Sequence, residues 1–441
     1  MLLTPWSCQC IWLKAGLLAG LVLLQSCASY GQRAATMRDS LMTGRPEAAL
    51  AIAEKQDPEG KDVIASLDKG MLRRITGDYE GSNRILESAK QEIDRLYGVS
   101  VTENLAAVTV NETMRSYVGD RYEQLLLHAY MAMNYIELGD YDAARVEMLQ
   151  ADVKMREWGD EPEDDPFVRY FEGIIYEALG EYDQALVSYR KAYNIYTEKA
   201  GRPYPPAPQV LKKDLLRLLD RLGLRDEYDR YKKAFGMANY RPVEAGEDDG
   251  ELVVILNNGL APIRRETAVM IFSPEVQHNL RVAFPVYEGK PALLMQPVVE
   301  TGSGRLAMEQ VENVDALARY SLEQAMPGIM ARAMARAVVK YNTQHSAQEN
   351  SALAGFLMTV TNIATERADT RSWTTLPQAI ELQRIRLPAG EHEIKIKLMN
   401  AAGHAVDEIS EKVRIKPGRI SFLIRHWSAP VPRPSRVRQT K

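Results

Sequence analysis

The stretch YIELGDYDAARVEMLQA at residues 135–151 returns as YEALGEYDQALVSYRKA at residues 176–192. Each copy runs from the end of one predicted helix, through a Gly followed by an acidic residue, into a second predicted helix. A Gly at that position lets the chain leave the first helix in a tight turn. The stretches predict two copies of one helical hairpin, because five residues recur 41 positions later: Tyr135, Gly139, Tyr141, Ala144 and Ala151.

Small residues also mark the places where the helices of each hairpin must approach closely. Ala132 and Gly173 stand three positions before the first Tyr of each copy. The pattern resembles the tetratricopeptide repeat (TPR), a helical hairpin of about 34 residues. The resemblance implies a solenoid of stacked hairpins, with seven extra residues here in the loop WGDEPEDDP at 158–166.

Weaker copies flank the two strong ones. Gly44 precedes Ala49, and Gly77 precedes Ser82, by the same five positions that separate Gly139 from Ala144. Gly223, just before LRDEYDRYKKAF, indicates a last, degenerate copy. We therefore predict a TPR-like domain of four to five hairpins over residues 35–240.

An insertion interrupts this domain at about residues 97–123, because the spacing from Gly77 to Gly139 is too long for one repeat. Its mixed β-branched and polar residues permit two interpretations. It is either a loop or short hairpin that covers the inner face of the array, or a functional lid or contact loop.

The composition changes after an acidic, Gly-containing linker at residues 241–251. Beyond it, β-branched alternation predicts strands, so we expect an α+β module with a small antiparallel β-sandwich at residues 252–426. A basic, Pro-rich tail follows at 427–441. Strands are expected at residues 251–259, 267–273 and 280–287. One long helix, bent at Pro327, is expected at residues 313–344.

Two further features of this module are expected to be β-hairpins. One turns at Pro388-Ala389-Gly390 and the other at Lys416-Pro417-Gly418, each between alternating segments. The run SALAGFLMTVTNIA at 351–364 is too short to span a bilayer upright. It is expected either as a helix buried beneath the sheet or as a segment inserted into a membrane or a partner.

All three cysteines lie at the start of the chain, and Cys27 follows a basic residue and an apolar run. Leu24-Gln25-Ser26-Cys27 resembles a lipobox, the cleavage site of bacterial lipoproteins. The resemblance implies a signal peptide at 1–26, palmitate and other acyl chains on Cys27, and a tether at 27–34. Ala28 resembles the outer-membrane sorting pattern, which implies an outer-membrane anchor facing the periplasm. The alternative is an ordinary secretory signal that is cut elsewhere.

The sequence contains no recognisable catalytic or metal-binding pattern. Its six His residues are scattered and occur at none of the usual zinc spacings, so no metal and no cofactor are predicted. A formal net charge of −4 argues against general nucleic-acid binding. His128 falls where the repeat packs a large side chain, and core packing is its expected role.

The segment ADTRSWTTLP at 368–377 offers a second candidate site, formed by Asp369, Arg371 and Trp373. We expect Arg371 to pair with a carboxylate and Trp373 to anchor the sheet, and a ligand site is the alternative. Together with the expected hairpin at Pro388-Ala389-Gly390 and LLLHAYMAMNYIELGDYDAARVE, this segment resembles a family of proteobacterial TPR outer-membrane lipoproteins. That resemblance implies no particular activity.

The function expected from these features is a non-catalytic adaptor for an envelope assembly, such as peptidoglycan synthesis control, export or complex assembly. TPR-like arrays bind proteins along an extended inner surface. The residues expected to form a partner-binding groove there are Met133, Phe167, Tyr170, Ile174 and Glu177. The alternative is a cell-envelope hydrolase or transferase with its site in the carboxyl-terminal module.

Overall fold

The computed structural model describes most of the chain between residues 31 and 428. The described ranges are 31–57, 62–103, 116–159, 164–201, 203–242, 246, 248–287, 295–350 and 367–428. Cys27, the run 351–364 and the tail beyond 428 lie outside them. Within the described ranges, no helix has the length and apolar character needed to cross a membrane.

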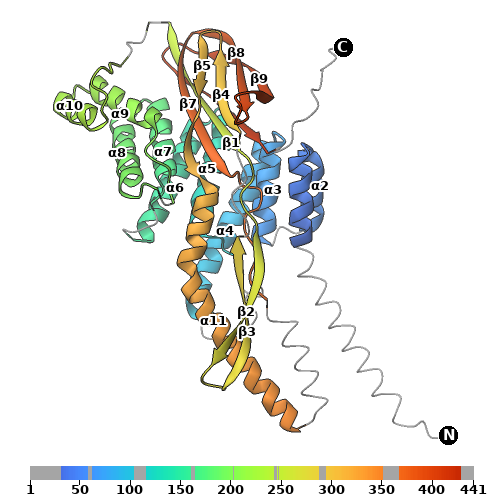
Figure 1. Ribbon diagram of the computed structural model, residues 1–441. Coiled ribbons are helices and arrows are strands. Elements are labelled where there is room, and N and C mark those ends of the chain that lie inside the picture. The colour runs from blue at the N-terminus through green and yellow to red at the C-terminus, as the bar shows by residue number, and fades with distance from the viewer. Residues whose placement is uncertain are drawn as a thin grey trace.

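The first half is an array of helical hairpins, as the repeats predict (Figure 1). Neighbouring helices pack in pairs along the chain, so the TPR-like fold class is confirmed. The helices are residues 31–42, α2 (Pro46–Gln56), α3 (Val63–Ile75), α4 (Tyr79–Glu103), α5 (Arg121–Glu137), α6 (Tyr141–Glu157), α7 (Pro166–Ala178), α8 (Tyr182–Glu198), α9 (Gln209–Arg221) and α10 (Arg225–Ala234).

The repeat residues occupy the positions that the alignment predicts. Gly139 and Gly180 end α5 and α7 with φ values of 80° and 83°, in the left-handed region that only Gly adopts without strain. Ala144 and Ala185 are fully buried between the helices of their hairpins. The conserved spacing of the two stretches therefore corresponds to the same turn and the same close helix contact in both hairpins.

The predicted insertion is partly helical. α4 continues through Glu103, so residues 97–103 extend a repeat helix instead of forming a loop. The chain is described again from residue 116, and α5 begins at Arg121. Residues 104–115, the centre of the insertion, lie outside the described ranges.

The second half contains two four-stranded sheets packed face to face and one separate hairpin. The strand orders are β10-β1-β7-β6, β5-β4-β8-β9 and β2-β3, and only the β1–β10 pair is parallel. The strands are β1 (Asp249–Asn258), β2 (Arg264–Ser273), β3 (His278–Tyr287), β4 (Gln296–Thr301), β5 (Gly304–Ala307), β6 (Glu309–Asn313), β7 (Ala379–Pro388), β8 (Gly390–Met399), β9 (Ala405–Ile415) and β10 (Ile420–Trp427).

Both predicted hairpins of the module are wrong in one respect: their strands do not pair. The chain crosses from one sheet to the other between β7 and β8, and again between β9 and β10. β1 takes the place beside β7 and β10 that a hairpin partner would fill. Alternating polarity marks a strand with one buried face, but it does not identify the strand beside it. β8 instead forms a hairpin with β9.

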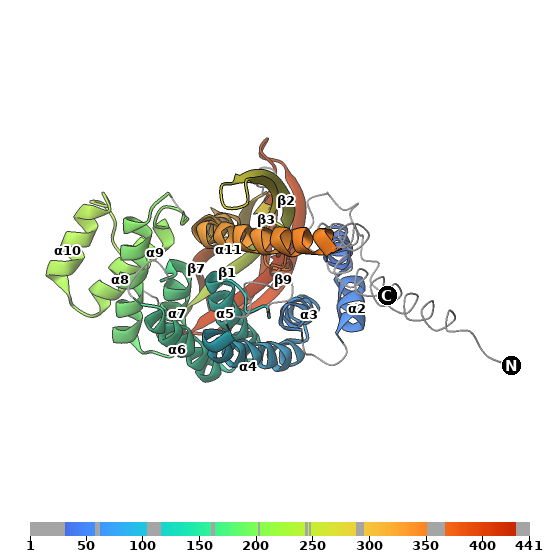
Figure 2. The ribbon, with the colours of Figure 1, turned by 90° about the horizontal axis from the view of Figure 1, so that it is seen from below.

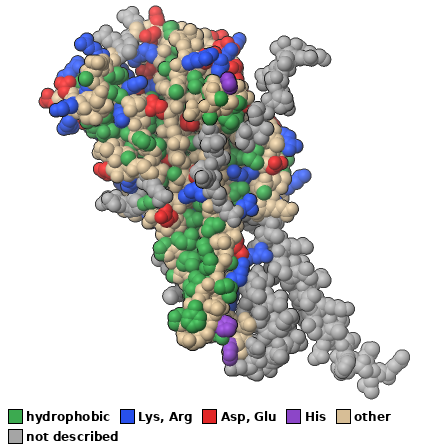
Figure 3. Space-filling model, in the orientation of Figure 1, with side chains coloured by type: hydrophobic (Ala, Val, Ile, Leu, Met, Phe, Trp, Pro, Cys, Tyr) green, Lys and Arg blue, Asp and Glu red, His purple; other side chains and the backbone are tan. Residues whose placement is uncertain are grey.

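α11 (Val314–Asn350) continues as one helix past Pro327. The β2–β3 hairpin packs on its distal part through Leu280, Val282, Ala333 and Ala337. This helix and hairpin project from the body of the molecule (Figures 1 and 3). We call them the arm, defined as residues 264–287 and 324–350.

The inner face of the helical array lies against the sheet β10-β1-β7-β6 (Figure 2). Tyr130 of α5 donates a 2.8 Å hydrogen bond to the Asn257 side chain on β1, and Tyr196 of α8 donates to the Val311 carbonyl on β6. One continuous hydrophobic core contains residues of both halves. The array and the module therefore share a core.

Candidate functional site

The five side chains expected to form a partner groove are buried. Met133, Phe167, Tyr170 and Ile174 have no exposed surface, and Glu177 retains 6%. They belong to or adjoin the core that the helices share with the chain's own sheet. The inner face is thus occupied by the chain's own sheet, whereas the repeat pattern predicts a groove for a separate protein there.

Glu177 is the clearest example of this internal use. Arg384 of β7 approaches both of its carboxylate oxygens at 2.9 Å, and Arg217 of α9 pairs with the same group. Burial alone would raise the pKa of Glu177, but the two guanidinium groups outweigh it and hold that pKa well below its ordinary value. Arg384 also pairs with Asp214 and Glu251. Tyr170 donates to Asp214 at 2.7 Å.

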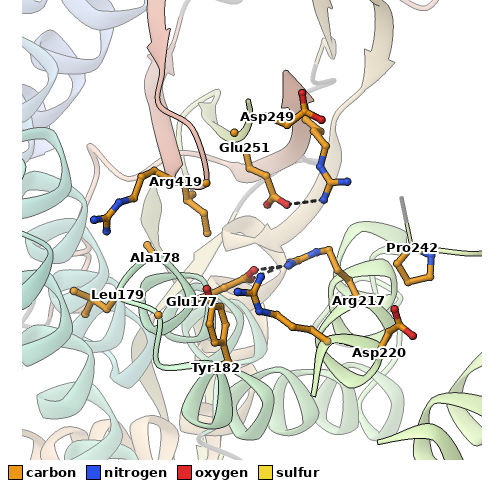
Figure 4. Close-up of a pocket in the computed structure, with 16 residues that line it drawn as sticks. Glu177, Ala178, Leu179, Tyr182, Arg217, Asp220, Pro242, Asp249, Glu251 and Arg419 are labelled. Atoms are coloured by element: carbon orange, nitrogen blue, oxygen red, sulfur yellow. Dashed lines mark hydrogen bonds and ion pairs between the residues drawn. The ribbon is translucent and has the colours of Figure 1, made fainter. Parts of the chain in front are cut away.

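A cleft of about 450 Å³ opens beside this ion cluster, between α7, α9 and the sheet edge (Figure 4). Four acidic and four basic side chains line it, so its charges balance. Two of them, Glu177 and Arg217, face each other in an ion pair. The remaining charged residues are Asp220, Asp249, Glu251, Arg221, Arg386 and Arg419. This arrangement joins the two halves and lacks a nucleophile paired with a base.

The second predicted site lies in the segment that leads into β7. Arg371 donates to the Asp369 carboxylate at 2.7 Å, a pairing between near neighbours. The Trp373 backbone donates to Glu123 of α5 at 2.8 Å, and its buried ring lies edge-on to Tyr130, with centroids 6.0 Å apart. Through these contacts the segment connects the helices to the sheet.

Several carboxyl groups buried between the helices and the carboxyl-terminal module are not predicted by the sequence. Asp68 of α3 accepts hydrogen bonds from Thr374 and Thr375, yet burial raises its pKa to about 7. Burial likewise raises the pKa of Asp165 to about 6, and burial and the charge of Asp165 raise that of Glu312. Acidic residues at predicted helix starts and strand ends are common, so no sequence signal separates these from exposed ones.

An open groove of about 670 Å³ lies on the outer side of the array, along α6. Val146, Leu149 and Val153 follow one another at helical spacing there, and each is 41–46% exposed. Trp158 closes one end under the Arg121 guanidinium. The polar rim includes an ion pair of 2.7 Å between Lys154 and Asp94 of α4.

The sister repeat shows that this apolar stripe is not required by the fold. At the offset of 41 residues, Val146 corresponds to Val187, Leu149 to Arg190, and Val153 to Asn194. Arg190 of α8 pairs with Glu227 of α10. The same helix position thus carries a charged, internally paired side chain in one repeat and an exposed apolar one in the other.

The described residues contain no cluster of three or more His, Cys, Asp or Glu side chains able to hold a metal ion. His128 is buried, and its Nδ1 lies 2.9 Å from Glu147, which also pairs with Lys90. His128 therefore packs between helices, as the repeat position predicts.

Comparisons with known proteins concern the helical repeats. No protein-family model matches the sequence, and no curated protein matches it. A crystal structure of MamA is 15% identical, with a TM-score of 0.29 over 46% of this chain and 96% of its own. MamA from Desulfovibrio magneticus is 14% identical, with a TM-score of 0.30 over 46% of this chain and 92% of its own. TPR-like repeats of a Podosopora anserina putative kinesin light chain are 12% identical, with a TM-score of 0.33 over 47% and 92%.

Proposed function

We propose that this chain is a non-catalytic scaffold of the bacterial envelope, anchored through acylated Cys27 and facing the periplasm from the outer membrane. The lipobox-like sequence before Cys27 supports the anchor, and the TPR-like array supports protein binding. No nucleophile–base pair is evident in the cleft of Figure 4, whose charges serve ion pairs. The proposed work of the molecule is to hold an envelope protein in place.

The partner docks on the outer groove along α6. The inner face is already filled by the chain's own sheet, and opening it would expose the shared core to water. The groove instead presents three apolar side chains on one helix with a polar rim, which suits the apolar face of an amphipathic helix. This apolar stripe, absent from the sister repeat, is the observation that carries the proposal.

The double substitution Leu149→Arg with Val153→Asn tests the site, because it installs the residues that α8 carries at the same repeat positions. Tagged wild-type and variant proteins are purified from detergent-solubilised envelopes, and bound proteins are identified by mass spectrometry. We expect the variant to remain folded and in the membrane fraction but to lose the partner. Cys27→Ser should leave an uncut precursor or a soluble form, and labelled palmitate should enter the wild type only.

The matched control is Val187→Asp on α8, which is also 43% exposed. It should retain the partner. Equal recovery of every partner by the wild type and the double variant would refute docking on this groove. Equal labelling of the wild type and Cys27→Ser by palmitate would refute the anchor.

A further inference from the structure

Two acidic side chains meet without a base where the helical array joins the sheet. Asp165 stands at the start of α7 and Glu312 near the end of β6, and the two residues are 1% and 0% exposed. Among the described residues, no Lys or Arg forms an ion pair with either carboxyl group. Two buried negative charges without a counterion are too costly to persist in a folded chain.

The hydrogen bonds of the pair require a proton. Asp165 Oδ1 accepts from the Val168 backbone at 2.9 Å, and Glu312 Oε1 accepts from the Asn313 backbone at 2.7 Å. The other two oxygens, Asp165 Oδ2 and Glu312 Oε2, are buried and receive no N–H or O–H donor from any described residue. The two side chains are hydrogen-bonded to each other. Because ionised carboxylates only accept, one of the two groups must be protonated.

The surroundings place this proton on Glu312. Asp165 caps α7, where the backbone N–H groups of Phe167 and Val168 and the positive end of the helix dipole favour its ionised form. The backbone donor of Glu312 is the N–H of the next residue, Asn313. Burial and the charge of Asp165 accordingly raise the pKa of Glu312 well above its ordinary value, whereas burial raises the pKa of Asp165 only to about 6.

The charged and titratable groups described around the pair do not neutralise it. Tyr196 of α8 donates to the Val311 carbonyl, and Tyr204 donates to the Asp164 carbonyl at 3.2 Å. Burial raises the pKa of both tyrosines well above the ordinary value, so both stay neutral. The Asp164 carboxylate pairs with Arg169 at 2.9 Å. The remaining titratable neighbours are Glu309 of β6, which accepts from the start of α9, and Tyr130 of α5, which donates to Asn257.

We propose that Asp165 and Glu312 share one proton at neutral pH and form an alkaline-sensitive lock between the array and the sheet. The protonated Glu312 donates to the Asp165 carboxylate and so holds the start of α7 to β6. Loss of this proton to water at alkaline pH leaves two facing charges in a buried interface, and their repulsion opens the lock. Opening exposes the inner face of the array beside α7, which the sheet otherwise covers. The lock goes beyond the proposed scaffold function and does not depend on the groove along α6.

Hydrogen exchange of the full mature chain between about pH 7 and about pH 9 tests the lock, with intrinsic exchange rates corrected for pH. Peptides from the start of α7 and from β6 should lose roughly tenfold more protection over this range than peptides from the β8–β9 hairpin. Glu312→Gln should remove this excess loss, because its amide N–H donates to Asp165 at every pH and does not ionise. Equal pH dependence of the α7 and β6 peptides in the wild type and in Glu312→Gln would overturn the proposal.

Glu309→Gln is the matched control, because Glu309 lies on the same strand but bonds to the start of α9. It should keep the pH dependence of the wild type. Infrared difference spectroscopy at neutral pH locates the proton: one protonated-carboxyl band should disappear in Glu312→Gln and remain in Asp165→Asn. Retention of every such band in both variants, or loss of a band in Asp165→Asn alone, would contradict the shared proton on Glu312.

Discussion

Glu177 shows what one residue can and cannot reveal before the structure is known. Its position on a helix with apolar neighbours suggests a charge exposed for a partner. In the folded chain its partners are Arg217 and Arg384, 40 and 207 residues away in sequence. A buried charge is tolerated when opposite charges and hydrogen bonds surround it. Only the fold brings these groups together.

Asp165 offers a test of pH dependence at this scale. Its folded-state pKa of about 6 lies above the unfolded value, so its stabilising contribution is complete below about pH 4. That contribution is lost as the pH rises through 6. Asp68, with a pKa of about 7, and Glu381, with a pKa of about 8, extend the loss upward. We therefore expect the free energy of unfolding to fall between about pH 4 and pH 8.

Asp165→Asn removes one of these ionisations but keeps an oxygen that can accept from the Val168 backbone, as Asp165 does at 2.9 Å. Urea unfolding across the pH range should show a shallower loss for this variant, by on the order of 2–3 kcal/mol. Asp140→Asn is the control, because Asp140 caps α6 in the same way but is exposed. Identical slopes for Asp165→Asn and the wild type would contradict this assignment.

At the scale of the element, Gly173 of α7 makes a close contact with α8. A Cβ atom there would overlap the Tyr189 ring and lie 3.2 Å from the Ala185 carbonyl oxygen. Tyr189 is fully buried and donates to Glu177 at 2.8 Å, so its ring cannot move aside without losing that bond. Gly173→Ala should lower the free energy of unfolding by about 1–3 kcal/mol.

Gly328→Ala in α11 is the matched helical control. Its added Cβ would meet only the far end of the Arg332 side chain, at 3.3 Å. Removing a helical Gly at an open site should stabilise the protein by up to about 1 kcal/mol. Denaturant titration of both variants measures the contrast, and equal effects would show that α7 and α8 are not in close contact at Gly173.

The repeat helices were predictable from sequence because each carries its own periodicity and its own turn Gly. Gly139 and Gly180 fix both the end of a helix and the register of the next. β1 beside β7 and β4 beside β8 were not predictable in this way, since each pair is distant in sequence. The strands β4, β5 and β6 were not predicted, because four to six residues are too few for a clear alternation.

The candidate sites likewise include features that the local sequence predicts and features that depend on the packing of the two halves. The buried role of His128 followed from its repeat position, and the stripe on α6 could have been found by comparing Leu149 and Val153 with Arg190 and Asn194. The burial of the inner face under the chain's own sheet could not have been found from the sequence, because it depends on how the helical array and the carboxyl-terminal module pack together. Solenoid repeats normally leave that face to a partner.

For the whole molecule, we infer that the array and the carboxyl-terminal module unfold as one cooperative unit, because they share one core. The ties span the chain: Arg38 of the first helix donates to the carbonyls of Ala261 and Thr374, and Arg425 of β10 pairs with Glu137 of α5. Glu309 of β6 accepts from the Val210 backbone at the start of α9. We therefore place the proposed partner on an outer surface.

Native-state hydrogen exchange, followed peptide by peptide in low denaturant, tests this claim most directly. Elements that share a core open together, so α5, α7, β1 and β7 should exchange with the same free energy and the same denaturant dependence. The arm, joined to the body at one end, should exchange at lower free energy. If α5 and α7 open at a free energy clearly different from that of β1 and β7, the two halves fold separately, and the inner face is open to a partner after all.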